Sequence, residues 1–290
     1  MGGLKEVRER ITSISSTMQI TSAMKMVSAA KLRRAQDAIA RMRPYAGKLK
    51  EILENLSATL EPSEGGAYSK ERAIEKVLLV AISSNRGLCG GFNSNINKKA
   101  LVLANGEYAG KEVSVLSSGK KSGEFLDRRG FNVVSTHNDI FDDLTLENIT
   151  PIAQGIMDAF VEGEYDRVDI IYNQFKNAAT QITVAEQFLP VAPPEVKEEN
   201  TSSTDYIFEP KKAEIVQDLI PRSLKTQLFK AALDSHAAEH GARMTAMHKA
   251  TDNASDLLKD LKLTYNKARQ ASITNEILEI VGGAAALEEG

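Results

Sequence analysis

The fold is decided by the stretch from Arg222 to Val281, which reads RSLKTQLFKAALDSHAAEHGARMTAMHKATDNASDLLKDLKLTYNKARQASITNEILEIV. It follows Pro221, the last proline of the chain, and it contains a single glycine, Gly241. Because proline and glycine are the residues that interrupt helices, the stretch predicts one continuous helix of roughly 90 Å. An average globular helix has about 11–12 residues, so this one is not an ordinary core helix.

The end of this predicted helix is apolar, whereas chain ends are usually polar and frayed. Its large apolar residues cover most of the helix circumference: Ile273, Ile277, Leu278, Ile280 and Val281. A helix that is apolar all round is buried. One partner helix cannot cover every side, so the pattern predicts a hydrophobic ring or socket supplied by other chains.

Residues 4 to 60 carry a heptad repeat, which predicts a second long helix in a coiled coil. Apolar residues fill fourteen of its seventeen seam positions, which are Leu4, Val7, Ile11, Ile14, Met18, Thr21, Lys25, Ser28, Leu32, Ala35, Ile39, Met42, Ala46, Leu49, Leu53, Leu56 and Leu60. Pro44 lies inside the repeat and is expected to kink or divide the helix near Met42.

The three polar seam positions, Thr21, Lys25 and Ser28, are consecutive. Nearby apolar residues such as Met26 and Val27 lie off the seam there. Two interpretations are open: this part of the helix contacts something other than its partner helix, or the supercoil has a local stutter.

Between the two helices the sequence changes period. Strands are expected at 76–82, 112–116, 132–135, 167–172 and 181–188, and helices at 92–104, 119–129 and 146–162. Alternating strands and helices predict an α/β domain with a mainly parallel sheet.

The expected fold is therefore a long antiparallel two-helix coiled coil, built from both chain ends, with an inserted Rossmann-like α/β domain of about five strands. We expect an N-terminal helix at 1–60, a linker at 61–72, the α/β domain at 73–205, and a connector with the C-terminal helix at 206–290. One row of the second helix is expected to face the first: Met247, Ala250, Ala254, Leu257, Leu261, Thr264, Ala268 and Ala271.

Composition narrows the class of protein. The single cysteine, Cys89, excludes an internal disulfide and suggests a reducing compartment. No apolar run approaches the roughly 20 residues of a membrane span, and the start shows no leader pattern. We therefore expect an intracellular protein without direct membrane insertion. Residues 1–60 hold eleven Lys and Arg against five Asp and Glu, a net +6 in a chain of net −3. This charge indicates either a solvated face or an acidic partner.

Few motifs point to chemistry, so we expect no catalytic, cofactor or metal site. His236 to His240 matches H-x-x-E-H, a zinc signature, but no third ligand is evident nearby. The turn from Ser83 to Gly91 joins a strand to a helix, where phosphate-binding loops sit, yet it matches no phosphate-binding motif. A basic stretch within residues 31–43 lacks interleaved aromatics, so nucleic-acid binding is weakly supported.

Three segments resemble the gamma subunit of F-type ATP synthases, in order along the chain. They are ITSAMKMVSAAKLRRAQ at 20–36, RGLCGGFN at 86–93, and ATDNA at 250–254 followed by YNKARQASITNEI at 265–277. The resemblance implies a rotor shaft without an active site, which couples proton flow through the membrane sector to ATP synthesis or hydrolysis by rotating.

The resemblance also implies partners: three alpha and three beta subunits of the catalytic head, the epsilon subunit and the membrane rotor c-ring. It implies a peripheral location on the cytoplasmic face of the bacterial inner membrane. Contacts with beta are expected at Met24, Lys25, Arg243, Gln270, Thr274 and Glu276. The side facing the rotor ring and epsilon is expected at Tyr206, Ile207, Phe208 and Glu209.

Two other functions are compatible with parts of the sequence. One is an enzyme that binds a nucleotide at Gly87–Gly91, and the other is a generic coiled-coil scaffold. The apolar C-terminal end favours the shaft over the scaffold, because a scaffold has no need of such an end.

Overall fold

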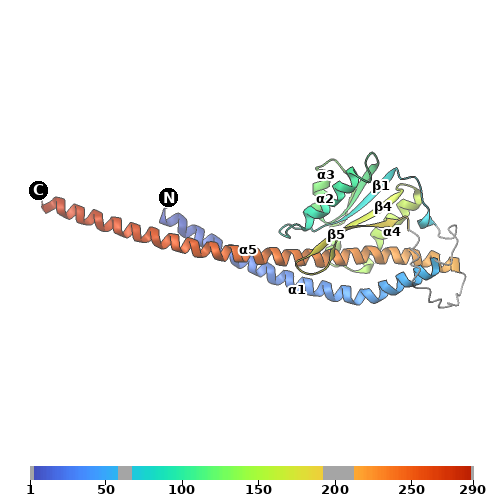
Figure 1. Cartoon of the computed structure of the whole chain (residues 1–290), viewed down its shortest axis with the longest axis horizontal. Coiled ribbons are helices and arrows are strands. Elements are labelled where there is room, and N and C mark those ends of the chain that lie inside the picture. Colours follow the sequence, from blue (N-terminus) through green and yellow to red (C-terminus); the bar gives the residue numbers. More distant parts are fainter. Residues whose placement is uncertain (1–2, 58–66, 192–211, 289–290) are drawn as a thin grey trace. The chain divides into compact units, whose positions relative to one another are not determined.

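The computed structural model describes residues 3–57, 67–191 and 212–288, which form two compact units. The first unit holds the residues up to Val27 and those from Met244 onward, and the second runs from Ser28 to Arg243. Two long helices, α1 (Leu4–Ser57) and α5 (Lys212–Glu288), contribute to both units, and the sheet with its helices belongs to the second (Figure 1).

Both long helices pass through a proline without a break. The expected division of the first helix at Pro44 is wrong, because α1 is one helix from Leu4 to Ser57. The second helix begins at Lys212, ten residues before the expected start at Arg222, and includes Pro221. A proline removes one backbone hydrogen bond. In α5 the neighbouring Ile220 and Leu224 are buried in the core of the second unit, so packing holds the helix on both sides of Pro221.

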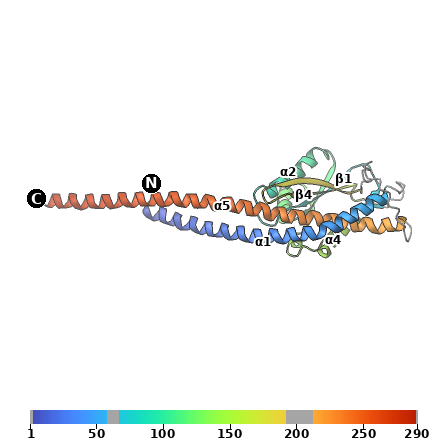
Figure 2. The same ribbon diagram turned by 60° about the horizontal axis from the view of Figure 1, so that its bottom comes forward.

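In the first unit, α1 and α5 lie side by side and antiparallel (Figure 2). The hydroxyls of Thr21 and Thr251 lie 2.9 Å apart, and Arg8 donates to the hydroxyl of Tyr265 at 2.8 Å. The heptad keeps its phase through the polar positions of α1, since Thr21 and Ser28 are buried at 9% and 2% exposure. The stutter interpretation is therefore wrong.

The partner row on α5 was predicted correctly at five of its eight positions and wrongly at Leu257, Thr264 and Ala271. Met247 and Ala254 are buried as expected, but Leu257 is 45% exposed and Leu258 is buried at 8%. From there the half-buried row follows Leu261, Tyr265, Ala268 and Ser272, while Thr264 and Ala271 are exposed. Two adjacent leucines left the phase undecided in the sequence.

The second unit contains a five-stranded sheet in the order β3-β2-β1-β4-β5. Its strands are β1 (Lys76–Ile82), β2 (Glu112–Ser118), β3 (Asn132–Thr136), β4 (Arg167–Phe175) and β5 (Gln181–Leu189). The first four are parallel, and β5 pairs antiparallel with β4. Helices α2 (Phe92–Asn105), α3 (Lys120–Asp127) and α4 (Leu146–Glu162) connect them, with short 3₁₀ turns at Ala67–Ser69 and Asp139–Phe141. The predicted fold class is thus confirmed.

Two cores cover the two faces of the sheet, and β1 shows why. Leu78, Val80 and Ile82 belong to the core that contains α4 and the first turns of α5, while Val77 and Leu79 belong to the core that contains α2. A parallel strand buried on both faces is apolar throughout rather than alternating, which matches the sequence Lys-Val-Leu-Leu-Val-Ala-Ile.

Candidate functional site

The apolar end of α5 has no partner among the described residues. Antiparallel pairing places Arg8 level with Tyr265. Because α1 begins at Leu4, only a few residues before Arg8, α5 continues beyond the start of α1 without a partner helix (Figure 2). The apolar side chains beyond this point are exposed by 47% to 72%: Ile273, Ile277, Leu278, Ile280 and Val281. We call these five residues the apolar tip. Large apolar clusters exposed at one place mark interaction sites.

The residues expected to contact beta divide into two groups. Gln270, Thr274 and Glu276 are exposed next to the apolar tip, and Met24 and Lys25 are half-buried on α1. Glu276 accepts from Ser272 at 3.2 Å, and Thr274 donates to the carbonyl of Gln270 at 2.9 Å. These bonds lie within one helix and leave the outer faces of the side chains open.

Arg243 differs from the other five because it is buried, at 8% exposure. Its guanidinium donates to Glu239 and to the carbonyl oxygens of Arg86 and Gly87, at 3.2 Å and 3.4 Å. Burial outweighs the nearby positive charge and raises the pKa of Glu239 above its usual range. This arrangement could not be predicted from the sequence, because the carbonyls that Arg243 binds belong to a loop more than 150 residues earlier in the chain.

The two histidine rings of the H-x-x-E-H sequence lie edge to face on α5, with their centroids 4.5 Å apart. The Nε2 atoms of His236 and His240 are 3.1 Å apart, and the His236 ring stacks on Phe141. The carboxylate of Glu239 forms an ion pair with the guanidinium of Arg243. Within the described ranges, no group of three or more His, Cys, Asp or Glu could hold a metal ion. This pair is therefore a packed element of the core rather than a zinc site.

In this Rossmann-like domain the N-terminus of α3, beyond the end of β2, is already hydrogen-bonded to the turn that follows β1. In such folds the ligand meets free N–H groups at a helix N-terminus beyond the strand ends. Here Lys120, Lys121 and Ser122 at the start of α3 already donate their N–H groups, to Asn85 Oδ1, the Ser84 carbonyl and Ser83 Oγ.

Helix α5 contacts the same edge of the sheet at the end of β1. Ser235 donates to the carbonyl of Ile82, the last residue of β1, at 3.2 Å. Cys89, in the turn after β1, is buried at 2% exposure, and burial raises the pKa of its thiol. The arrangement of Ser83–Gly91 thus favours a structural turn over a nucleotide site.

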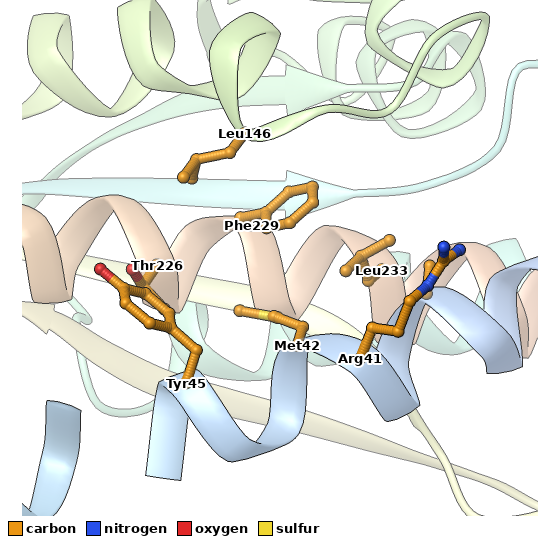
Figure 3. A pocket seen from close by; sticks show the side chains of 8 residues that line it. Arg41, Met42, Tyr45, Leu146, Thr226, Phe229 and Leu233 are labelled. Atoms are coloured by element: carbon orange, nitrogen blue, oxygen red, sulfur yellow. The ribbon is translucent and has the colours of Figure 1, made fainter. Parts of the chain in front are cut away.

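An apolar hollow in the second unit was not anticipated from the sequence. It measures about 310 Å³ and lies among α1, α4 and α5 (Figure 3). Its lining consists of Ala38, Arg41, Met42, Tyr45, Leu146, Thr226, Phe229 and Leu233. These residues come from three separated segments, which is why no local motif marks them. They contain no acid–base pair and offer packing surface only.

The expected rotor-ring side, Tyr206 to Glu209, lies outside the described residues. Within the part of the chain that the structure describes, no helix combines the length and apolarity needed to cross a membrane.

The histidine pair predicts acid sensitivity. Burial lowers the pKa of His236 to about 4 and that of His240 to about 3, assisted by the positive charges of Lys31 and Arg243. In the unfolded chain both pKa values return to about 6.5. As the pH falls below 6.5, the unfolded chain binds protons that the folded chain refuses, so stability is lost with falling pH.

At pH 5 we expect each histidine to cost about 2 kcal/mol of unfolding free energy relative to pH 7.5, and the pair about 4 kcal/mol. Urea unfolding of the chain at both pH values measures this difference in unfolding free energy. Replacing both histidines with glutamine should flatten the dependence, whereas His248→Gln, at an exposed position, should leave it unchanged. An equal pH dependence in all three proteins would contradict the assignment.

Fold and site together define a class of protein: a coiled-coil interaction subunit with an inserted α/β domain and an unpartnered apolar tip. Comparison with known proteins makes this specific. The ATP synthase family model matches residues 3–287. The ATP synthase gamma chain of Flavobacterium johnsoniae is 64% identical over 287 residues, covering 99% of both chains. That of Chlorobaculum tepidum is 43% identical over 293 residues and covers 100% of both chains.

Solved structures agree with these sequence matches. A chain of the central stalk/c-ring structure of the Tetrahymena thermophila mitochondrial ATP synthase is 27% identical, with a TM-score of 0.59, over 80% of this chain and 99% of that one. A chain of the Euglena gracilis mitochondrial ATP synthase, at 24% identity and a TM-score of 0.72, covers 99% of this chain and 95% of that one, and shows the shared fold. The chain belongs to the family of ATP synthase gamma chains. It is a subunit of that complex and not its catalytic subunit.

Proposed function

We propose that this chain is the central rotor shaft of a bacterial F-type ATP synthase. It couples proton flow through the membrane sector to ATP synthesis or hydrolysis in a head of three alpha and three beta subunits. The observation that carries the proposal is the apolar tip, which needs a socket that none of the described residues supplies. The full-length match to bacterial ATP synthase gamma chains supports it.

The shaft works by presenting different side chains to the head as it turns. A ring of three alpha and three beta subunits has near threefold symmetry, whereas α1 and α5 have different sequences and so present different side chains on different sides of the shaft. The net +6 of residues 1–60 suits acidic loops on beta. Off the seam of α1, Ile20, Met26 and Val27 are exposed by 59% to 63%, which supplies apolar contact beside this charge.

We propose beta contacts at five of the six predicted positions: Met24, Lys25, Gln270, Thr274 and Glu276. Arg243 is left out of this direct set because its guanidinium is bound inside the second unit. Tyr206, Ile207, Phe208 and Glu209 are proposed to face the c-ring and the epsilon subunit. The complex holds the chain peripherally on the cytoplasmic face of the inner membrane.

Reconstitution tests the proposal. Purified alpha and beta subunits mixed with this chain should form a complex with one copy of it per three beta subunits, and that complex should hydrolyse ATP. A bead attached through a cysteine introduced into the α/β domain should rotate when ATP is added. A chain that joins the complex at another ratio, or a bead that stays still during hydrolysis, would contradict the shaft.

A further inference from the structure

The turn between β1 and α2 contains an unusual backbone conformation. Leu88 is the one residue other than glycine with a positive φ among the described residues, at 63°, and its side chain is 66% exposed. A left-handed conformation is unfavourable for leucine and persists only where the surroundings impose it. Something must therefore hold this turn in place.

Arg243 supplies the strongest hold. Its Nη2 donates to the carbonyls of Arg86 and Gly87, the two residues that precede Leu88, at 3.2 Å and 3.4 Å. Its Nη1 donates to Glu239, one helical turn earlier on α5, and both side chains are buried at 8% exposure. A planar guanidinium spreads its donors over a rigid fork, so it can reach a carboxylate and two carbonyls on different sides, whereas an ammonium group concentrates its three donors on one atom.

Two further contacts tie this region together. Ser235 donates to the Ile82 carbonyl at 3.2 Å, so α5 is attached to the end of β1 as well as to the turn that follows it. Within the turn, Ser84 Oγ donates to the Arg86 carbonyl at 2.6 Å. From Ser235 to Arg243 the attachment spans about 12 Å of helix.

We propose that Arg243 is the positioning residue of a clamp that fixes the β1–α2 turn to α5, so that the sheet and this part of the shaft helix turn as one body. The clamp concerns contacts inside the chain, which is a role distinct from contact with beta. Its mechanical consequence rests on the proposed rotor function, but the clamp itself does not.

Cys89 provides a direct probe of the clamp. It lies two residues after Gly87, is buried at 2% exposure, and is the only cysteine in the chain. A maleimide reacts with its thiolate only when the turn opens. The labelling rate of the purified full-length chain therefore reports opening of this turn.

The decisive variant is Glu239→Met with Arg243→Met, because it removes the clamp without leaving a buried charge unpaired. Arg243 lowers the pKa of Cys89 and Glu239 raises it, so removing both largely preserves the thiol's own reactivity. We expect labelling about tenfold faster than in the unmodified chain. Arg243→Lys should give a smaller acceleration, because lysine restores the charge but not the fork.

Tyr172→Phe is the matched control. It removes a part-buried hydrogen bond to Glu186, of 2.7 Å, in the same unit but in the core on the opposite face of the sheet from Cys89. Labelling within about twofold of the unmodified chain is expected. If this control accelerates labelling as much as the double variant, the opening is global and the clamp is overturned. Unchanged labelling in the double variant overturns it as well.

A second measurement addresses the mechanical role. In the assembled complex, the double variant should retain ATP hydrolysis but pump fewer protons per ATP into inverted membrane vesicles. Faster labelling of Cys89 with unchanged pumping would retain the clamp and overturn its role in transmitting torque. Failure of the unmodified chain to support any pumping would contradict the rotor function and leave the labelling result standing.

Discussion

Replacing Gly119 with alanine should lower the free energy of unfolding by more than about 4 kcal/mol, a loss rarely reached by a single substitution. Gly119 follows β2 with a φ of +109°, where side chains are strained. An added Cβ would lie 2.2 Å from the carbonyl oxygen of Ser83 and 2.9 Å from its hydroxyl. The two nearest atoms belong to the backbone of Ser83, so the contact cannot be relieved by moving a flexible side chain.

The damage would spread because this contact joins two strands. Ser83 donates its N–H to the Ser118 carbonyl at 2.7 Å, and its hydroxyl donates to the Gly119 carbonyl at 3.1 Å. Displacing Ser83 would break both bonds and free the N-terminus of α3. A loss of this size is a large part of the 5–15 kcal/mol that stabilises a typical domain.

Chemical unfolding followed by circular dichroism measures the loss, and two other glycines serve as controls. Gly110 has a φ of +78° but no atom within 4 Å of an added Cβ, so Gly110→Ala should cost about 1–2 kcal/mol for the backbone alone. Gly155 lies within α4 with open space around it, and Gly155→Ala should be neutral or stabilising. Equal losses at Gly119 and Gly110 would show that the close contact contributes nothing.

The sequence predicted what depends on local periodicity. The strand at Lys76–Ile82 and the helix at Leu146–Glu162 were predicted with the observed bounds, and the heptad phase of α1 held even at its polar positions. In these segments each residue's burial follows from its spacing alone. The apolar tip was predicted for the same reason, since its lack of a partner follows from the residues themselves.

Prediction failed where the outcome depends on a distant partner. Leu257 and Leu258 are equally apolar, and only the packing of α5 against α1 shows that the second lies in the seam. Arg243 reads as a surface residue until the fold brings the carbonyls of the β1–α2 turn to it. Pro221 indicated a helix start because its cost is local, whereas the packing that offsets it comes from the sheet.

Removing residues 273–290 should separate folding from assembly. The apolar tip side chains are exposed in this chain, by 47% to 72%, so their loss takes little packing from it. We expect the unfolding midpoint of the shortened chain to stay within about 2 °C of the full chain. Binding to the alpha–beta head should weaken at least about tenfold, because fully burying one such side chain contributes about 1.5–3 kcal/mol.

A milder variant tests the same point without shortening the helix. Ile277→Asn with Ile280→Asn keeps the backbone and the neighbouring Glu276 but places two amides where the socket must be apolar. Burying such groups without partners is costly, so dissociation from the head should again be at least about tenfold faster. Val102→Asn on α2 is the matched control, since Val102 is 64% exposed and Ile280 is 72% exposed.

The comparison between these variants decides what the apolar tip is for. An effect at Ile277 and Ile280 that is absent at Val102 places the binding energy at the tip rather than in general surface apolarity. If the shortened chain assembles and couples ATP hydrolysis to proton pumping as the full chain does, the prediction of a socket for the apolar tip is wrong. The torque must then pass through the proposed contacts nearer the α/β domain, at Met24 and Lys25, where α1 and α5 are still paired.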